Sequence, residues 1–80
     1  MSEKVTKEVK EIISQQLGVP IEELNSDSSM KLLGADSLDL VDIIMEIEEE
    51  FDINIRDEEA EKVDTIVQIV ELIEKKLSEK

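Results

Sequence analysis

Hydrophobic residues recur every three or four positions near the start of the chain, in residues 3–17. This spacing places them on one face of a helix, and we expect that face to be buried. Gly18 can adopt the left-handed conformation that ends many helices, and Pro20 cannot continue one. The expected buried face consists of Val5, Val9, Ile12, Ile13 and Leu17.

A second helix is predicted from Leu38 to Phe51, a stretch without glycine or proline. At about 100° per residue, its side chains fall into three stripes. The inner stripe, which we expect to face the core, contains Leu40, Ile43, Ile44, Ile47 and Phe51. The acidic stripe, on the far side, contains Asp39, Asp42, Glu46, Glu49 and Glu50. The outer apolar stripe, between these two, contains Leu38, Val41 and Met45. A helix with one core face has no need of a further apolar stripe, so we expect a partner to cover it.

A long connector joins these two helices, and its residues 25–29 are rich in turn formers. A loop of this length is uncommon in a compact domain unless side chains fix it to the core. We expect four apolar side chains to do so: Leu24, Met30, Leu32 and Leu33.

The residues after the second helix predict a break and then a short third helix. Ile53 and Ile55 alternate with polar residues, so we expect at least one of them to be buried. Asp57 can cap a helix that runs through Lys62, with further acidic residues in its first turn.

The last helix is predicted to begin at Thr65, which with Gln68 has the spacing of a capping box. Its expected buried face contains Ile66, Ile69, Val70, Ile73 and Leu77, and Lys75, Lys76 and Lys80 suit its C-terminal end. Three long amphipathic helices and one short helix predict an all-α fold. We expect a small four-helix bundle, with a long loop between helices one and two, in a single domain of residues 1–80.

The composition excludes several classes of chemistry. The 80 residues include no cysteine and no histidine, so the chain lacks a thiol nucleophile and the commonest general base and metal ligand. No aliphatic run is long enough to span a membrane, and the first residues do not resemble a signal peptide. We therefore expect a cytoplasmic, monomeric protein that is not an enzyme.

The charge of the chain is strongly acidic and is concentrated in its middle. The formal net charge is −13, and residues 36–64 hold thirteen acidic residues against two basic ones. Such a surface disfavours nucleic acid and membrane insertion. It favours protein partners with basic docking surfaces.

Ser37 stands where the loop gives way to the second helix, after Gly34, which permits a turn. In the simplest interpretation Ser37 or Asp36 only caps the helix. A helix N-terminus is also a favourable place for a phosphate, because free N–H groups and the helix dipole point toward it. A hydroxyl there, beside an acidic and an apolar stripe, could carry a phosphodiester.

These residues resemble a known family. The run Leu-Gly-Ala-Asp-Ser-Leu-Asp at residues 33–39, followed by Glu-Glu-Glu-Phe-Asp at 48–52, looks like the acyl carrier protein of dissociated, type II fatty-acid synthases. Gln-Leu-Gly-Val at 16–19 and Asp-Glu-Glu-Ala-Glu-Lys at 57–62 extend the likeness over nearly the whole chain.

The resemblance implies the cofactor, the partners and the function. Ser37 would carry a covalent 4′-phosphopantetheine taken from coenzyme A, and Asp36 would help the phosphopantetheinyl transferase to recognise the site. The protein would hold growing acyl chains as thioesters for the acyl-processing enzymes of fatty-acid biosynthesis. Partners would contact Leu38, Asp39, Val41, Asp42, Met45, Glu46 and Glu49.

The acyl chain itself is expected to enter the bundle beside the second helix. The inner stripe there is aliphatic apart from Phe51, and the resemblance also suggests this place. We expect the acyl pocket to be formed by Leu40, Ile44 and Ile47 on one side and by Ala60, Val63 and Ile69 on the other.

Other interpretations remain open from the sequence. An EF-hand loop starting at Asp27 would need a glycine and a glutamate where Leu32 and Leu38 stand, so we predict no metal site beyond loose divalent binding. The chain could be a carrier for a dedicated pathway, such as polyketide synthesis, or an unmodified acidic interaction module. Residues 29–32 depart from the family pattern, since many members have an aromatic and acidic residues there.

Overall fold

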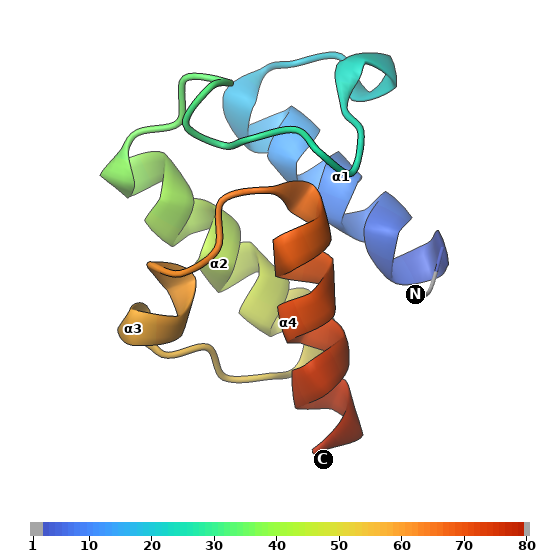
Figure 1. The fold of residues 1–80 in the computed structure, drawn as a ribbon, viewed down its shortest axis with the longest axis vertical. Helices are drawn as coiled ribbons and strands as arrows, with labels where there is room; N and C mark the ends of the chain where they lie inside the picture. The colour runs from blue at the N-terminus through green and yellow to red at the C-terminus, as the bar shows by residue number, and fades with distance from the viewer. Residues whose placement is uncertain (1–2, 80) are drawn as a thin grey trace.

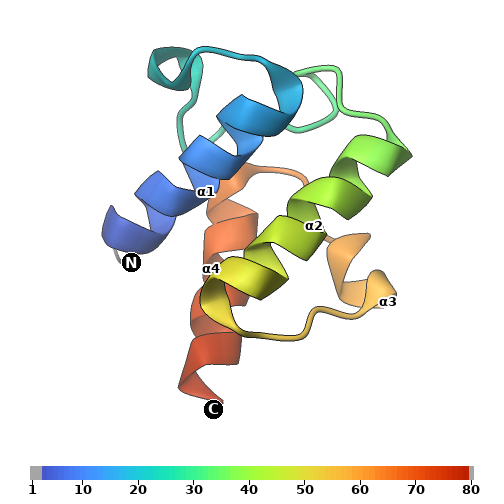
Figure 2. The same ribbon diagram turned by 180° about the vertical axis from the view of Figure 1, so that it is seen from behind.

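The computed structural model describes residues 3–79. These form four α-helices: α1 (Glu3–Leu17), α2 (Ser37–Phe51), α3 (Asp57–Ala60) and α4 (Ile66–Ser78). A short 3-10 helix, η1 (Ile21–Glu23), lies in the long loop and was not predicted. Helix α1 packs against both α2 and α4, and the short α3 lies beside α2 (Figures 1 and 2). The predicted all-α bundle of three long helices and one short helix is confirmed. Lys80 lies outside the described residues.

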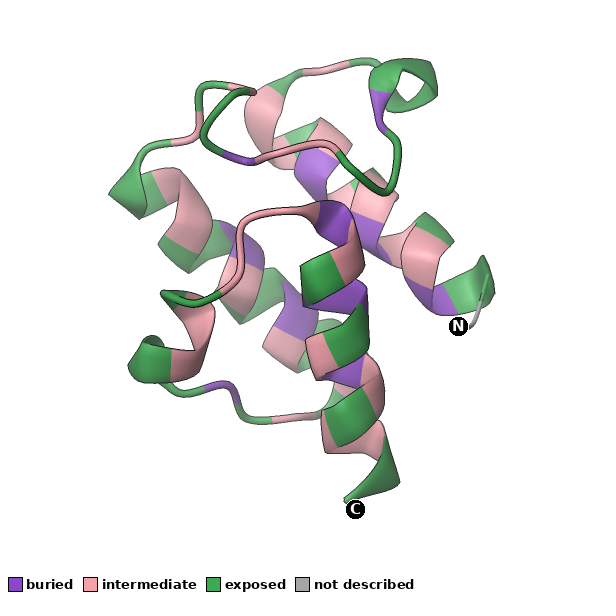
Figure 3. Cartoon of the chain, viewed as in Figure 1, coloured by how far each residue is buried: buried purple, intermediate pink, exposed green. Residues whose placement is uncertain are grey.

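The core is apolar throughout the described part of the chain, because the buried faces of α1, α2 and α4 meet (Figure 3). The predicted faces of these helices are all inside, with the residues at their edges half-buried. The fully enclosed members include Val9, Ile13, Ile43, Ile47, Ile66, Val70 and Ile73. None of the helices in residues 3–79 combines the length and the apolar character needed to cross a membrane.

The helix boundaries follow from local hydrogen bonds. Gly18 ends α1 with φ at +71°, as predicted. The predicted capping box of α4 is present: the Gln68 N–H donates to Thr65 Oγ1 at 3.3 Å, and the Thr65 N–H donates to Gln68 Oε1 at 3.1 Å.

The predicted bounds of the third helix were wrong. Helix α3 begins at Asp57 rather than being capped by it, because the Arg56 N–H donates to Glu59 Oε1 at 3.0 Å. It ends at Ala60 rather than Lys62, because the chain tightens there and the Lys62 N–H bonds to the carbonyl of Glu59. Ile55 is buried and Ile53 half-buried, as the alternation predicted.

The long loop crosses one end of the bundle and is fixed there by the start of α4 (Figure 1). The Ile66 N–H donates to the Ser28 carbonyl at 3.1 Å, and the Val67 N–H donates to the Ser26 carbonyl at 2.9 Å. The loop therefore supplies acceptors for N–H groups that a helix leaves free in its first turn.

Asp64 also holds this loop in place through hydrogen bonds. Its carbonyl accepts the Met30 N–H at 2.9 Å, and its carboxylate accepts the Ser29 hydroxyl and the Lys31 N–H. The hydrogen bond from Ser29 lowers the pKa of Asp64, because it stabilises the ionised carboxylate.

Three of the four side chains expected to fix the loop do so. Leu24 and Met30 are buried, and Leu33 packs against the core. The prediction for Leu32 was wrong, since this side chain is 89% exposed. Residues 31–34 form a tight turn in which the Gly34 N–H bonds to the Lys31 carbonyl. The core position is taken by Met30, so the turn leaves Leu32 outside.

Candidate functional site

The N-terminus of α2 is built by a reciprocal pair of hydrogen bonds. The Asp39 N–H donates to Asp36 Oδ1 at 2.9 Å, and the Asp36 N–H donates to Asp39 Oδ2 at 3.2 Å. Asp36 is thus the N-cap, and Ser37 is the first residue of the helix. Gly34, with φ at +93°, turns the loop into this cap. The hydroxyl of Ser37 is not used as the cap, and its residue is exposed.

The outer apolar stripe of α2 lies in solvent, as its position in the sequence predicted. Leu38 is 74% exposed, Val41 53% and Met45 54%. The acidic stripe lies beside it: Asp39 is half-buried, and Asp42, Glu46, Glu49 and Glu50 are exposed. Asp42 also accepts a hydrogen bond from Gln16 Nε2 of α1 at 3.3 Å. Both stripes begin within two residues of Ser37.

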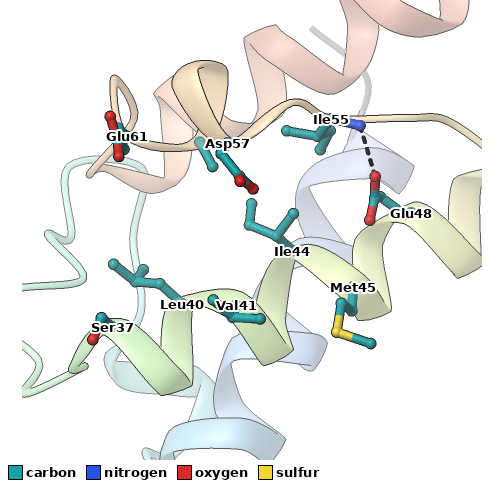
Figure 4. A pocket seen from close by; sticks show the side chains of 10 residues that line it. Ser37, Leu40, Val41, Ile44, Met45, Glu48, Ile55, Asp57 and Glu61 are labelled. Carbon is teal, nitrogen blue, oxygen red and sulfur yellow. Dashed lines mark hydrogen bonds between the residues drawn. The ribbon is translucent and has the colours of Figure 1, made fainter.

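A groove of about 360 Å³ runs between α2 and the segment that contains α3 (Figure 4). Its α2 side is lined by Ser37, Leu40, Val41, Ile44, Met45 and Glu48. Its opposite side is lined by Ile55, Asp57, Ala60 and Glu61. Most of the lining is apolar, and the carboxylates of Glu48, Asp57 and Glu61 complete it.

Three of the six residues expected in the acyl pocket line this groove: Leu40, Ile44 and Ala60. Ile47 and Ile69 lie deeper, in the closed core, and Val63 is half-buried outside the lining. Ile55 and Glu48 also line the groove but were not predicted to do so. The alternation of Ile53 and Ile55 with polar residues was a signal for Ile55, whereas no sequence pattern pointed to Glu48, whose place depends on how the chain turns after α2.

Glu48 joins the two sides of the groove. Its Oε2 accepts the Ile55 N–H at 2.7 Å in a half-buried position (Figure 4). Helix α3 is also linked to α4 by an ion pair, since Lys76 Nζ lies 2.8 Å from Glu59 Oε1. The hydrogen bond from Lys76 lowers the pKa of Glu59.

The residues at the start of α2 fit a phosphodiester-linked arm. The attachment needs an accessible hydroxyl, which Ser37 provides at the end of a helix whose first N–H groups favour a phosphate. The groove that begins at Ser37 offers an apolar surface to whatever such an arm carries. Within residues 3–79, no three aspartate, glutamate, histidine or cysteine side chains converge closely enough to hold a metal ion.

Comparisons with known proteins agree with this geometry. Residues 7–73 match the family model described as "Phosphopantetheine attachment site". A curated acyl carrier protein of Clostridium acetobutylicum is 51% identical over 70 residues, which cover 86% of this chain and 91% of that protein.

Two solved structures have a similar fold. The crystal structure of an acyl carrier protein from Thermotoga maritima aligns with a TM-score of 0.83 and 34% identity, covering 96% of this chain and 91% of that one. The solution structure of hexanoyl acyl carrier protein from the actinorhodin polyketide synthase of Streptomyces coelicolor aligns with a TM-score of 0.79. It is 23% identical and covers 91% of this chain and 90% of that one, so it supports the fold alone.

Proposed function

The chain belongs to the acyl carrier protein family, non-catalytic carriers with a covalent 4′-phosphopantetheine, and from this premise we propose that Ser37 receives the arm. One observation carries the proposal: Ser37 is an exposed hydroxyl on the first residue of α2, at the start of an apolar groove. Because Asp36 already caps the helix, the Ser37 hydroxyl is available for a phosphodiester bond. The Asp36 carboxylate next to it is the proposed contact of the transferase.

Intact-mass measurement tests this assignment. Wild-type protein incubated with coenzyme A and a phosphopantetheinyl transferase should gain the mass of a single arm, and Ser37→Ala should gain none. Ser26→Ala is the control, because Ser26 is also an exposed serine but lies outside the helices. An arm on Ser37→Ala would show that another residue is modified. A wild-type protein that never loads would support an unmodified acidic interaction module instead.

We infer that partner enzymes dock on α2 around Ser37. The acidic stripe together with Asp36 would meet lysine and arginine side chains, and the outer apolar stripe would supply a small apolar centre. Opposite charges on two surfaces accelerate their encounter, and this effect is screened beyond about 10 Å at 0.1 M salt. The family acts with acyl-processing enzymes and with phosphopantetheinyl transferase in general, so these are the proposed partners.

The groove is the proposed site of the cargo. Each methylene group removed from water contributes about 0.8 kcal/mol, so six buried methylenes would contribute roughly 5 kcal/mol before any cost of widening the groove. Leu40, Ile44 and Ala60 would contact the chain first, with Ile47, Val63 and Ile69 behind them. Methyl NMR of the octanoyl form tests this proposal: shifted Leu40 and Ile44 methyls are expected, and unmoved ones would place the cargo outside.

We propose fatty-acid biosynthesis as the pathway served. The run of residues 34–39, Gly-Ala-Asp-Ser-Leu-Asp, and the similarity to the curated acyl carrier protein support this choice over a dedicated pathway. The loaded protein should accept repeated two-carbon extensions from purified fatty-acid elongation enzymes, as followed by mass. The described residues share one hydrophobic core, which supports a single attachment domain.

A further inference from the structure

Glu48 occupies a particular place at the end of the groove away from Ser37. It lies eleven residues after Ser37 on the same helix, which is about 16 Å along the axis at about 1.5 Å per residue. The α2 residues that line the groove between these two are apolar: Leu40, Val41, Ile44 and Met45.

The same residue holds the chain that leaves α2 at two points. Its carbonyl accepts the Ile53 N–H at 3.2 Å, and its carboxylate accepts the Ile55 N–H at 2.7 Å. Ile55 is itself buried, and α3 begins two residues later at Asp57. The link from Glu48 to Ile55 therefore sets how close the two walls of the groove come at this end (Figure 4).

An apolar chain that advances from Ser37 meets a different environment at this link. Methylene groups along Leu40 and Ile44 replace water on apolar side chains. At Glu48 they would have to strip water from a carboxylate or break its bond to the Ile55 N–H, and burying an unpaired charge or an unpaired N–H is unfavourable.

We propose that Glu48 sets the longest acyl chain that the groove can shelter, by closing the groove through its hydrogen bond to Ile55. The proposal rests on the function given above, in which Ser37 carries the arm and the groove takes its cargo. Chains up to the limit gain contacts with each added carbon, and longer chains turn back into solvent at Glu48.

A series of acyl forms tests the proposal on the full chain. Wild type, Glu48→Ala, Glu48→Gln and Glu71→Ala are loaded with saturated chains from butanoyl to hexadecanoyl, and each melting temperature is compared with that of the same protein carrying the bare arm. In wild type the gain should rise with chain length and then stop rising. In Glu48→Ala it should continue for at least one further two-carbon step, because the link is lost.

Two variants serve as controls. Glu48→Gln keeps an oxygen that can accept the Ile55 N–H, so its limit should equal that of wild type. Glu71→Ala removes the same charge from an exposed residue of α4 that neither lines the groove nor belongs to the acidic stripe, so its limit should also be unchanged. The same limit in Glu48→Ala and wild type would overturn the proposal.

A second measurement uses wild type alone and stands even if Glu48→Ala does not fold. The terminal methyl of the acyl chain is labelled with carbon-13, and its contacts are followed by NMR. At the limiting length it should contact Ile55, and in longer chains it should lose that contact. Contacts of longer chains with Ile47 or Ile69 would show passage into the core and would overturn the proposal. The mass of the protein is measured first. A protein that never gains the arm refutes the proposed function rather than the role of Glu48.

Discussion

Replacing Asp36 and Ser37 one at a time should separate the stability of α2 from the loading of the arm. The two residues are neighbours in sequence but do different work, because Asp36 makes the capping bonds and Ser37 makes none of them. Ser37→Ala should therefore abolish loading without destabilising the fold. Asp36→Ala should lower stability.

The magnitude follows from the observed cap. Loss of an aspartate N-cap costs about 1 kcal/mol, within a range of about 0.5–2. In a domain of this size each 1 kcal/mol shifts the melting temperature by about 4–8 °C. Asp36→Ala should thus melt roughly 5 °C below wild type. Ser37→Ala should melt at or slightly above the wild-type temperature, since alanine is the better helix former by up to about 0.5 kcal/mol.

Asp36→Asn is the variant that isolates the charge. Asparagine caps a helix about as well as aspartate, so the melting temperature should stay close to that of wild type. If the transferase contacts the carboxylate, loading should slow by up to about fivefold, the effect expected of an exposed charge pair worth up to about 1 kcal/mol.

Thermal unfolding of the unloaded proteins and the rate of mass gain are the two readouts. The reasoning is refuted if Ser37→Ala melts as low as Asp36→Ala, because Ser37 would then be part of the cap. An Asp36→Ala protein as stable as wild type would contradict the capping box. Loading of Asp36→Asn at the wild-type rate would remove its carboxylate from the transferase contact.

Three further predictions concern docking, the loop and pH. Asp42→Lys combined with Glu49→Lys should weaken partner binding and its salt dependence while leaving the melting temperature nearly unchanged; affinity that ignores both the substitutions and added salt would make the acidic stripe a solubility feature only. Met30→Ala should cost about 2–5 kcal/mol of unfolding free energy because the side chain is fully enclosed, whereas the exposed Leu32→Ala should stay within about 0.5 kcal/mol; equal losses in urea denaturation would contradict the described loop. Because the pKa of Asp64 is lowered in the folded state, its stabilising contribution is present above the unfolded-state pKa of about 3.9 and is lost as the pH falls through the folded value. Asp64→Asn should therefore lose less stability than wild type between pH 5 and acid, and parallel pH profiles would rule out this contribution.

The sequence was most informative where the chain is helical. Periodicity assigns each residue of a helix to a face, so the core faces, the exposed stripe from Leu38 to Met45 and the cap at Thr65 could all be predicted. The loop has no such periodicity, so sequence alone could not tell which of its four apolar residues are buried. The structure shows that Met30 is inside and Leu32 outside because of a turn that hydrogen bonds to Asp64 help to place.

The candidate site was likewise predictable only where it lies on a single helix. The position of Ser37 and the two stripes beside it follow from one helix, so sequence alone could place them. The groove needs two walls from separate segments, and its far end depends on the Glu48 carboxylate reaching back to Ile55. Glu48 falls between the inner stripe and the outer apolar stripe on the helix, so periodicity gave no reason to single it out.

The pairing of the long loop with the start of α4 also bears on how the chain folds. Residues 26–31 bond to residues 64–67, which lie more than thirty positions away in sequence. Such distant contacts form only after most of the chain has been brought together, and they slow folding relative to local helical contacts. The N–H groups of Met30, Ile66 and Val67 form hydrogen bonds between these two segments. We expect them to open to solvent as one cooperative unit. We therefore expect the loop that leads into Ser37 to take its native form only after the start of the final helix is in place.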